Sequence, residues 1–131
     1  MKYVLDTNTL IYFFKGLGKV ASRLLATPPN EIGIPTIVIY ELEVGIAKSK
    51  SPERRKAQLH EFMSLINILP FGFDEAKCAA TIRAKLERKG IPIGHYDVLI
   101  AASALASNCT LVTHNKEEFE RIDGLKIEDW F

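Results

Sequence analysis

Short apolar runs alternate along the chain with longer segments in which apolar residues recur every three or four positions. The short runs predict strands, and the longer segments predict helices, because the wider spacing places apolar side chains on one helix face. Strands are predicted at residues 2–5, 32–34, 68–71, 111–113 and 125–127. Helices are predicted at residues 9–14, 19–26 and 36–48, from Ser51-Pro52, from Asp74 to Gly90, at residues 95–106, and from Asn115.

Several predicted helix ends carry capping residues. Thr36 and Asp74 are expected to cap the helices that follow them, because their side-chain oxygens can accept the free N–H groups of a first turn. Ser51-Pro52 starts another helix with a capping residue followed by proline, the favoured order. Gly90 is expected to end the helix that begins at Asp74.

The order of the elements predicts an α/β fold. Short apolar strands separated by helices are typical of a parallel sheet covered on both faces. The chain has 131 residues, which suffices for one domain, and it contains no repeat or linker-like stretch. We therefore expect a single domain, residues 1–131, with a short central parallel sheet flanked by helices. Active sites in such sheets form beyond the carboxyl ends of the strands.

The composition is that of an ordinary globular domain, with 17 Lys plus Arg, 16 Asp plus Glu and 47% hydrophobic residues. This excludes a disordered protein and a disulfide scaffold. No run approaches the ~20 apolar residues of a membrane span, and Asp6 comes too early for a signal peptide. Cys78 and Cys109 are expected to be buried free thiols in a reducing cytoplasm. The net charge of +1 neither favours nor excludes a nucleic-acid partner.

Four oxygen-bearing side chains map to one end of the predicted sheet. Asp6 follows the first strand, Glu41 lies in the helix after the second, Asp97 is near the start of the apolar helix, and Asn115 follows the fourth strand. Carboxylates gathered in this way repel one another unless a positive group lies among them. Mg²⁺ prefers such oxygen ligands, whereas the histidines and cysteines show no zinc-ligand spacing.

Each of these residues also has a structural interpretation. Asp6 is a possible helix N-cap, and Asp97 complements the positive end of its helix. Asn115 begins a capping-box pattern that is completed by Glu118. Glu43 points to a different helix face from Glu41, and we expect it to be exposed. The joint placement of the group, rather than any single position, carries the metal hypothesis.

Two basic clusters are candidate RNA contacts, since RNA needs positive surface even on a neutral protein. An exposed, solvated helix face is the alternative interpretation of either cluster. The first cluster consists of Lys48, Lys50, Arg54, Arg55 and Lys56, and the second consists of Arg83, Lys85, Arg88 and Lys89.

Nearly the whole chain resembles the PIN-domain ribonucleases, and within them the VapC toxins of bacterial toxin–antitoxin pairs. The resemblance is carried by several motifs that occur in the family's order. They are Val4-Leu5-Asp6-Thr7-Asn8, Tyr40-Glu41-Leu42-Glu43-Val44-Gly45, Ile82-Arg83-Ala84 with Lys89-Gly90-Ile91-Pro92-Ile93-Gly94 and Asp97, Val112-Thr113-His114-Asn115 through Glu118-Phe119, and Ile127-Glu128-Asp129-Trp130.

The resemblance implies a PIN-like three-layer fold and a metal-dependent endoribonuclease. It places a first Mg²⁺ (Mn²⁺ being the other candidate) on Asp6, Glu41 and Asp97, and a second ion on Asp6 with Asn115 or Glu118. Many relatives have aspartate at the position of Asn115. The resemblance further implies hydrolysis by metal-activated water, a structured RNA substrate such as tRNA, a homodimer and a VapB-like antitoxin that covers the acidic site. Arg83 lies inside a VapC-type motif.

Three other functions are open at this point. The first is a non-catalytic PIN fold that binds nucleic acid or protein, which the intact carboxylates disfavour. The second is a phosphoryl-transfer enzyme with Asp6 as nucleophile, although such enzymes usually need an acid where Asn8 stands. The third is metal-free acid–base cleavage of RNA by His95, which a single histidine supports poorly.

Overall fold

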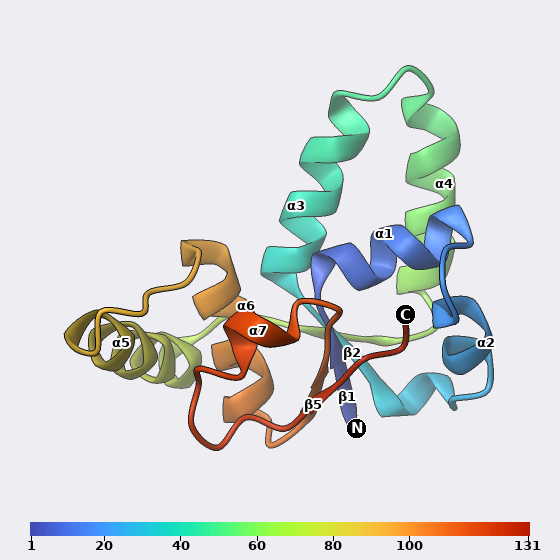
Figure 1. The fold of residues 1–131 in the computed structure, drawn as a ribbon. Coiled ribbons are helices and arrows are strands. Elements are labelled where there is room, and N and C mark those ends of the chain that lie inside the picture. The colour runs from blue at the N-terminus through green and yellow to red at the C-terminus, as the bar shows by residue number, and fades with distance from the viewer.

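The computed structural model describes residues 1–131 and contains a five-stranded sheet (Figure 1). All four pairs of neighbouring strands are parallel, in the order β3-β2-β1-β4-β5. The predicted α/β fold with a short parallel sheet is therefore confirmed. The strands are β1 (Tyr3–Leu5), β2 (Ile32–Pro35), β3 (Asn67–Leu69), β4 (Thr110–Val112) and β5 (Ile127–Glu128).

Helices connect the strands and flank the sheet, as the three-layer prediction requires. Figure 1 shows α3 and α4 as a hairpin that projects away from the sheet, with α1 beside it and α5 on the other side of the molecule. The helices are α1 (Thr7–Lys15), α2 (Val20–Leu25), α3 (Thr36–Ala47), α4 (Pro52–Met63), α5 (Phe73–Arg88), α6 (His95–Ala106) and α7 (Lys116–Phe119), with a 3₁₀ turn η1 (Pro29–Glu31) before β2.

The core forms around the central strands and α6. Val4 and Leu5 of β1 and Leu111 and Val112 of β4 have no exposed surface, because helices cover both faces of the sheet. Helix α6 is apolar on all sides and contacts β1, β4, α3 and α5, as expected of a helix inside a core. This burial fixes the positions of the two residues that precede the core stretch of α6, Tyr96 and Asp97.

Thr36 and Asp74 are not the N-caps of their helices, and Ser51 is the N-cap residue of α4 but its side chain makes no capping bond. Thr36 is the first residue of α3 and makes no capping bond; Pro35, whose φ is −63°, ends the strand and begins the helix. Asp74 lies inside α5, because Gly72 is the N-cap and its N–H donates to the carboxylate of Glu75 at 2.9 Å. Both errors move a helix start by one or two residues and leave the order of elements unchanged.

Two expectations from the sequence concern the burial of the cysteines and the absence of a membrane span. Cys109 is buried and Cys78 is half-buried, and both are free thiols. None of the helices combines the length and the apolar character needed to cross a membrane.

Candidate active site

The site forms at the carboxyl edge of the sheet, where the direction of strand order reverses. The chain runs from β1 to β2 and β3 on one side of β1 and then crosses to β4 on its other side, so a crevice is expected between β1 and β4 at this edge. Asp6 stands directly after β1, and Thr113 stands directly after β4. Helix α3, which follows β2, brings Glu41 to the same edge.

Asp6 is the most constrained carboxylate of the site, with only 5% of its surface exposed. Its Oδ1 accepts the backbone N–H of Thr9 at 2.9 Å, which makes it the N-cap of α1. Its Oδ2 accepts the hydroxyl of Thr113 at 2.6 Å. Burial raises the pKa of Asp6, although the bonds from Thr113 and Thr9 oppose the shift. Each carboxylate oxygen retains a lone pair, so capping leaves Asp6 able to bind a cation.

Glu41 is half-buried and is oriented by the residue that follows Asp6. The hydroxyl of Thr7, the first residue of α1, donates to Oε1 of Glu41 at 2.7 Å. This bond joins α1 to α3 across the crevice. Glu43 is exposed, as expected from its different helix face.

Asp97 lies in the first turn of α6 and is half-buried. Its pKa is raised from 3.8 to about 6, first by burial and then by the negative charges of Glu118, Asp6 and Glu41. A hydrogen bond with Glu118 raises the pKa further. The carboxylates predicted from strand ends therefore do share one electrostatic environment.

Asn115 does not complete the expected capping box. Its side chain makes no capping bond; instead its Nδ2 donates to Oε2 of Glu118 at 2.9 Å. The backbone N–H of Asn115 donates to the hydroxyl of Thr113 at 3.0 Å, which fixes the turn after β4. The capping-box prediction fails because the Glu118 carboxylate bonds the amide of Asn115 rather than its backbone. Asn115 thereby orients Glu118 beside Asp97.

The donor set fits a hard divalent cation. Asp6, Glu41, Asp97 and Glu118 offer only oxygen, and none of them forms an ion pair with lysine, arginine or histidine. Mutual repulsion, seen in the raised pKa of Asp97, is what a bound cation would relieve. In this conformation, no three of these side chains lie close enough together to bind one metal ion.

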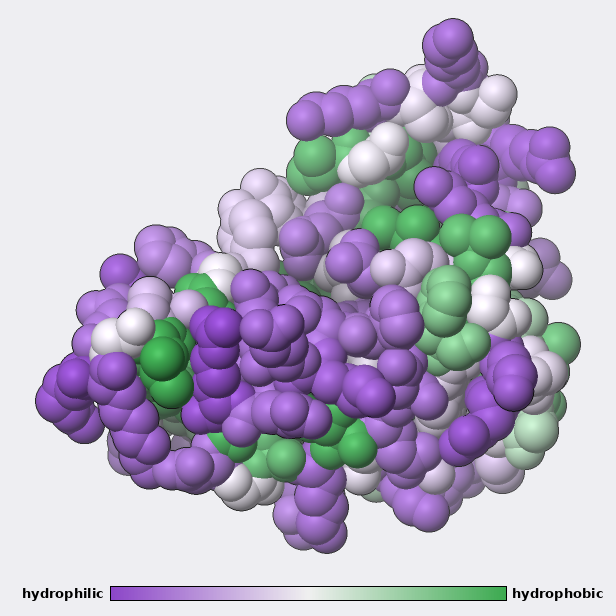
Figure 2. Space-filling model, viewed as in Figure 1, coloured by the Kyte–Doolittle hydropathy of each residue, from purple (hydrophilic) through white to green (hydrophobic).

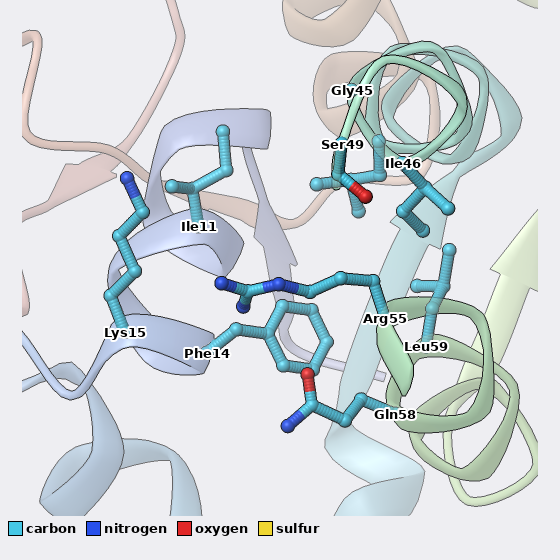
Figure 3. A pocket seen from close by; sticks show the side chains of 10 residues that line it. Ile11, Phe14, Lys15, Gly45, Ile46, Ser49, Arg55, Gln58 and Leu59 are labelled. Carbon is cyan, nitrogen blue, oxygen red and sulfur yellow. The ribbon is translucent and has the colours of Figure 1, made fainter. Parts of the chain in front are cut away.

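A cavity of about 330 Å³ lies between α1, α3 and α4, and none of the carboxylates lines it (Figure 3). Ile11 and Gly45 line it, and each is four residues, or one helical turn, beyond Thr7 and Glu41. Its walls are half hydrophobic, and Lys15 and Arg55 supply positive charge. Figure 2 shows hydrophobic side chains open to solvent over this part of the molecule. Sequence reasoning missed this cavity because it forms only through the packing of α1 against the hairpin of α3 and α4.

The two basic clusters differ in their ion pairing. In the second cluster, Arg83 pairs with Glu87, and Lys85 and Lys89 both face Asp123. The members of the first cluster form no ion pair with an acidic side chain; these are Lys48, Lys50, Arg54, Arg55 and Lys56.

His95 precedes Asp97 by two residues in α6 but faces a cavity that none of the carboxylates lines. Together with Arg83 and Phe71 it lines a separate cavity against α5. This position gives no support to metal-free acid–base chemistry at the acidic site.

A short parallel sheet that collects carboxylates at its carboxyl edge is the arrangement of a PIN domain, and the family model for the PIN domain matches residues 3–125. The protein named tRNA(fMet)-specific endonuclease VapC from Salmonella typhimurium is 38% identical over 99% of this chain and 98% of its own length. Ribonuclease VapC2 of Rickettsia felis is 39% identical over the same shares. The chain belongs to the PIN domain family and, within it, to the VapC ribonucleases.

Solved structures give the same result. A chain of VapBC2 from Rickettsia felis, crystallised with a DNA fragment from its promoter, superposes with a TM-score of 0.92 over all of both chains at 38% identity. A chain of DNA-bound VapBC from Salmonella typhimurium gives a TM-score of 0.93 at 39% identity, over 100% of this chain and 99% of that one. The resemblance read from the sequence motifs is therefore confirmed.

The raised pKa of Asp97 predicts a pH-dependent loss of stability without metal. Because the folded pKa of about 6 exceeds the ordinary 3.8, ionisation favours the unfolded state, so stability falls as pH rises from about 4 to about 6 and stays lower above. In EDTA, Asp97→Asn should be more stable than the wild type at neutral pH, and this advantage should shrink toward pH ~4. Urea unfolding across this range measures it, with Glu43→Gln as the exposed control. An advantage independent of pH would contradict the prediction.

The bond from Asn115 to Glu118 predicts the effect of restoring the family's commoner residue. Asn115→Asp would set two carboxylates against each other, so in EDTA its free energy of unfolding should fall by about 1 kcal/mol. Added Mg²⁺ should then raise its melting temperature more than that of the wild type. Asn115→Ala, which removes the bond without adding charge, is the matched control. An equal Mg²⁺ response in both variants would show that position 115 lies outside the metal's reach.

Proposed function

We propose that this protein is a metal-dependent endoribonuclease, the toxin of a toxin–antitoxin pair, which hydrolyses phosphodiester bonds in RNA. The observation that carries the proposal is the placement of Asp6, Glu41 and Asp97 at one edge of the sheet, where the charges of Asp6 and Glu41 contribute to the raised pKa of Asp97. The names of the VapC relatives support the activity, and tRNA(fMet)-specific relatives favour tRNA as the substrate. The two free thiols support a cytoplasmic location.

Asp6, Glu41 and Asp97 would hold one Mg²⁺, or Mn²⁺ in its place, and Asn115 and Glu118 are the side chains beside them for a second ion. Such a cation supplies the positive charge that binds the scissile phosphate and lowers the pKa of the attacking water. The chemistry needs it, because an anionic phosphate could not otherwise approach a group of unpaired carboxylates. The products would carry a 5′-phosphate and a 3′-hydroxyl.

The other residues of the site position these ligands. Thr113 and the Thr9 N–H fix both oxygens of Asp6, and Thr7 fixes one oxygen of Glu41. Asp97 must be ionised to bind a cation, and its pKa of about 6 means that it is mostly ionised at neutral pH. Activity should therefore decline on acidification through this range.

Two protein partners belong to the proposal. A VapB-like antitoxin is supported by the VapBC complexes that this chain resembles. We expect the antitoxin segment that covers the acidic site to extend into the half-hydrophobic cavity between α1, α3 and α4. A homodimer rests on the resemblance to VapC toxins. Mass measurement by light scattering, alone and with the antitoxin, tests both.

Asp97→Asn should abolish cleavage while leaving the fold intact. The substitution removes the charge that the cation needs and keeps the shape of the side chain. The measurement is cleavage of labelled tRNA in Mg²⁺, Mn²⁺ or EDTA, beside an aryl phosphate, with Glu43→Gln as the active control. Cleavage at the wild-type rate by Asp97→Asn would refute the metal site. Hydrolysis of the aryl phosphate would favour a phosphoryl-transfer enzyme. RNA binding without cleavage by the wild type would indicate a non-catalytic module.

Arg55→Ala should lower the salt dependence of RNA binding more than Arg83→Ala. Arg55 is free of acidic partners, whereas Arg83 must first leave Glu87. Each lost phosphate contact should reduce the slope of log K against log salt by about 0.7 to 0.9. Filter binding in EDTA over a salt series gives the slopes. Lys48, Lys50 and Arg54 belong to the same proposed RNA-binding surface. A slope that Arg55→Ala leaves unchanged would contradict the proposal that this surface binds RNA.

A further inference from the structure

Two tyrosines flank the candidate active site, each one residue before a proposed metal ligand. Tyr40 precedes Glu41 on α3, and Tyr96 precedes Asp97 on α6. Their ring centroids lie 5.7 Å apart with an angle of 60° between the planes, and their hydroxyl oxygens are 3.4 Å apart. Two helices from different parts of the chain thus bring an aromatic pair to the rim of the carboxylate crevice.

The pair is open to solvent and does not serve the core. Tyr40 is 51% exposed and Tyr96 is 47% exposed. An edge-to-face pair of this kind uses one side of a ring and leaves other ring surface free. Because Glu41 directly follows Tyr40 on α3 and Asp97 directly follows Tyr96 on α6, the exposed rings are next to the two carboxylates along their helices.

The surroundings of the pair distinguish an RNA base from a second copy of the chain as its occupant. If the two-fold axis of a symmetric dimer passed through this patch, the second copy would bring its own Glu41, Glu43 and Asp97 close to these carboxylates. A nucleobase is uncharged and has a face that stacks on aromatic rings. Its phosphate is the group that the adjacent cation would bind.

We propose that Tyr40 and Tyr96 form a stacking platform that holds an unpaired RNA base next to the scissile phosphate. This inference rests on the proposed ribonuclease function and names its substrate class: single-stranded segments such as loops. A base inside a duplex is already stacked and paired, so it cannot reach the rings. The platform makes the enzyme select unpaired nucleotides without reading a particular sequence.

The test compares alanine with phenylalanine at both positions. The probe is a fluorescein-labelled RNA hairpin that the wild type cleaves, with its fully paired stem as the second substrate. Binding is measured by fluorescence anisotropy in EDTA, and cleavage is measured in Mg²⁺. Tyr40→Ala and Tyr96→Ala should each weaken hairpin binding and slow cleavage by roughly tenfold. Tyr40→Phe and Tyr96→Phe, which keep the rings, should stay within about twofold of the wild type.

An abasic nucleotide supplies the complementary change on the RNA. Placed beside the cleaved bond, it should weaken binding by the wild type and add little further loss in the alanine variants. Phe73→Ala is the matched control, since Phe73 is 78% exposed and lies at the start of α5. It should bind and cleave as the wild type does. Equal unfolding midpoints for all variants would show that the fold is retained.

Three results would overturn the platform while the ribonuclease proposal stands. The first is that both alanine variants bind and cleave the hairpin as the wild type does. The second is that the abasic nucleotide weakens binding equally in the wild type and in the alanine variants. The third is that the loss of activity is accompanied by a change from dimer to monomer in light scattering. The last result would assign the tyrosines to an interface between copies. A wild-type protein that cleaves no RNA would instead refute the ribonuclease proposal, and the platform with it.

Discussion

The buried carboxylate of Asp6 joins parts of the chain that are 107 residues apart, because it accepts the hydroxyl of Thr113 as well as the N–H of Thr9. The first bond ties the end of β1 to the end of β4, and the second starts α1 at Thr7. Thr7 is then placed to hold Glu41. The sheet edge, the direction of α1 and the orientation of a second carboxylate all depend on one side chain, so structure and chemistry are not separable at this position.

Hydrogen bonds from its neighbours hold Asp6, whereas the neighbours of Asp97 disfavour its ionised form. Asp97 takes no part in capping α6, and neighbouring charges together with burial disfavour its ionised form. A sequence selected for stability alone would place a neutral residue here, and the strain of gathered charge is typical of sites kept for chemistry. Hydrogen bonds to Asp6, Glu41 and Glu118 stabilise the other members of the group, which leaves Asp97 as the carboxylate with the most to gain from a cation.

The parallel sheet was predictable because apolar periodicity defines the elements, and the placement of Asp6, Glu41 and Asp97 near one sheet edge follows because parallel strands end there. Their joint role as metal ligands stays a prediction. Local competition between side chains was not predictable. Whether Thr36 or Pro35 begins α3, and whether Glu118 bonds the backbone or the amide of Asn115, depends on differences of about 1 kcal/mol that composition does not reveal. The partner of Lys85 is Asp123, 38 residues away, and only the packing of α5 brings the two together.

The pairing of β1 with β4 also sets the order in which the molecule can assemble. On one side Tyr3 and Val4 pair with Ile32 and Gly33 of β2. On the other side Tyr3, Val4 and Leu5 pair with Thr110, Leu111 and Val112, so the central strand lacks one neighbour until that stretch has been made. At ~5–20 residues per second the delay is roughly 5 to 20 seconds. During this time Asp6 has no Thr113 to bond, and the crevice has only one of its walls. The central strand and the first carboxylate of the site are therefore made first but completed only near the end of synthesis.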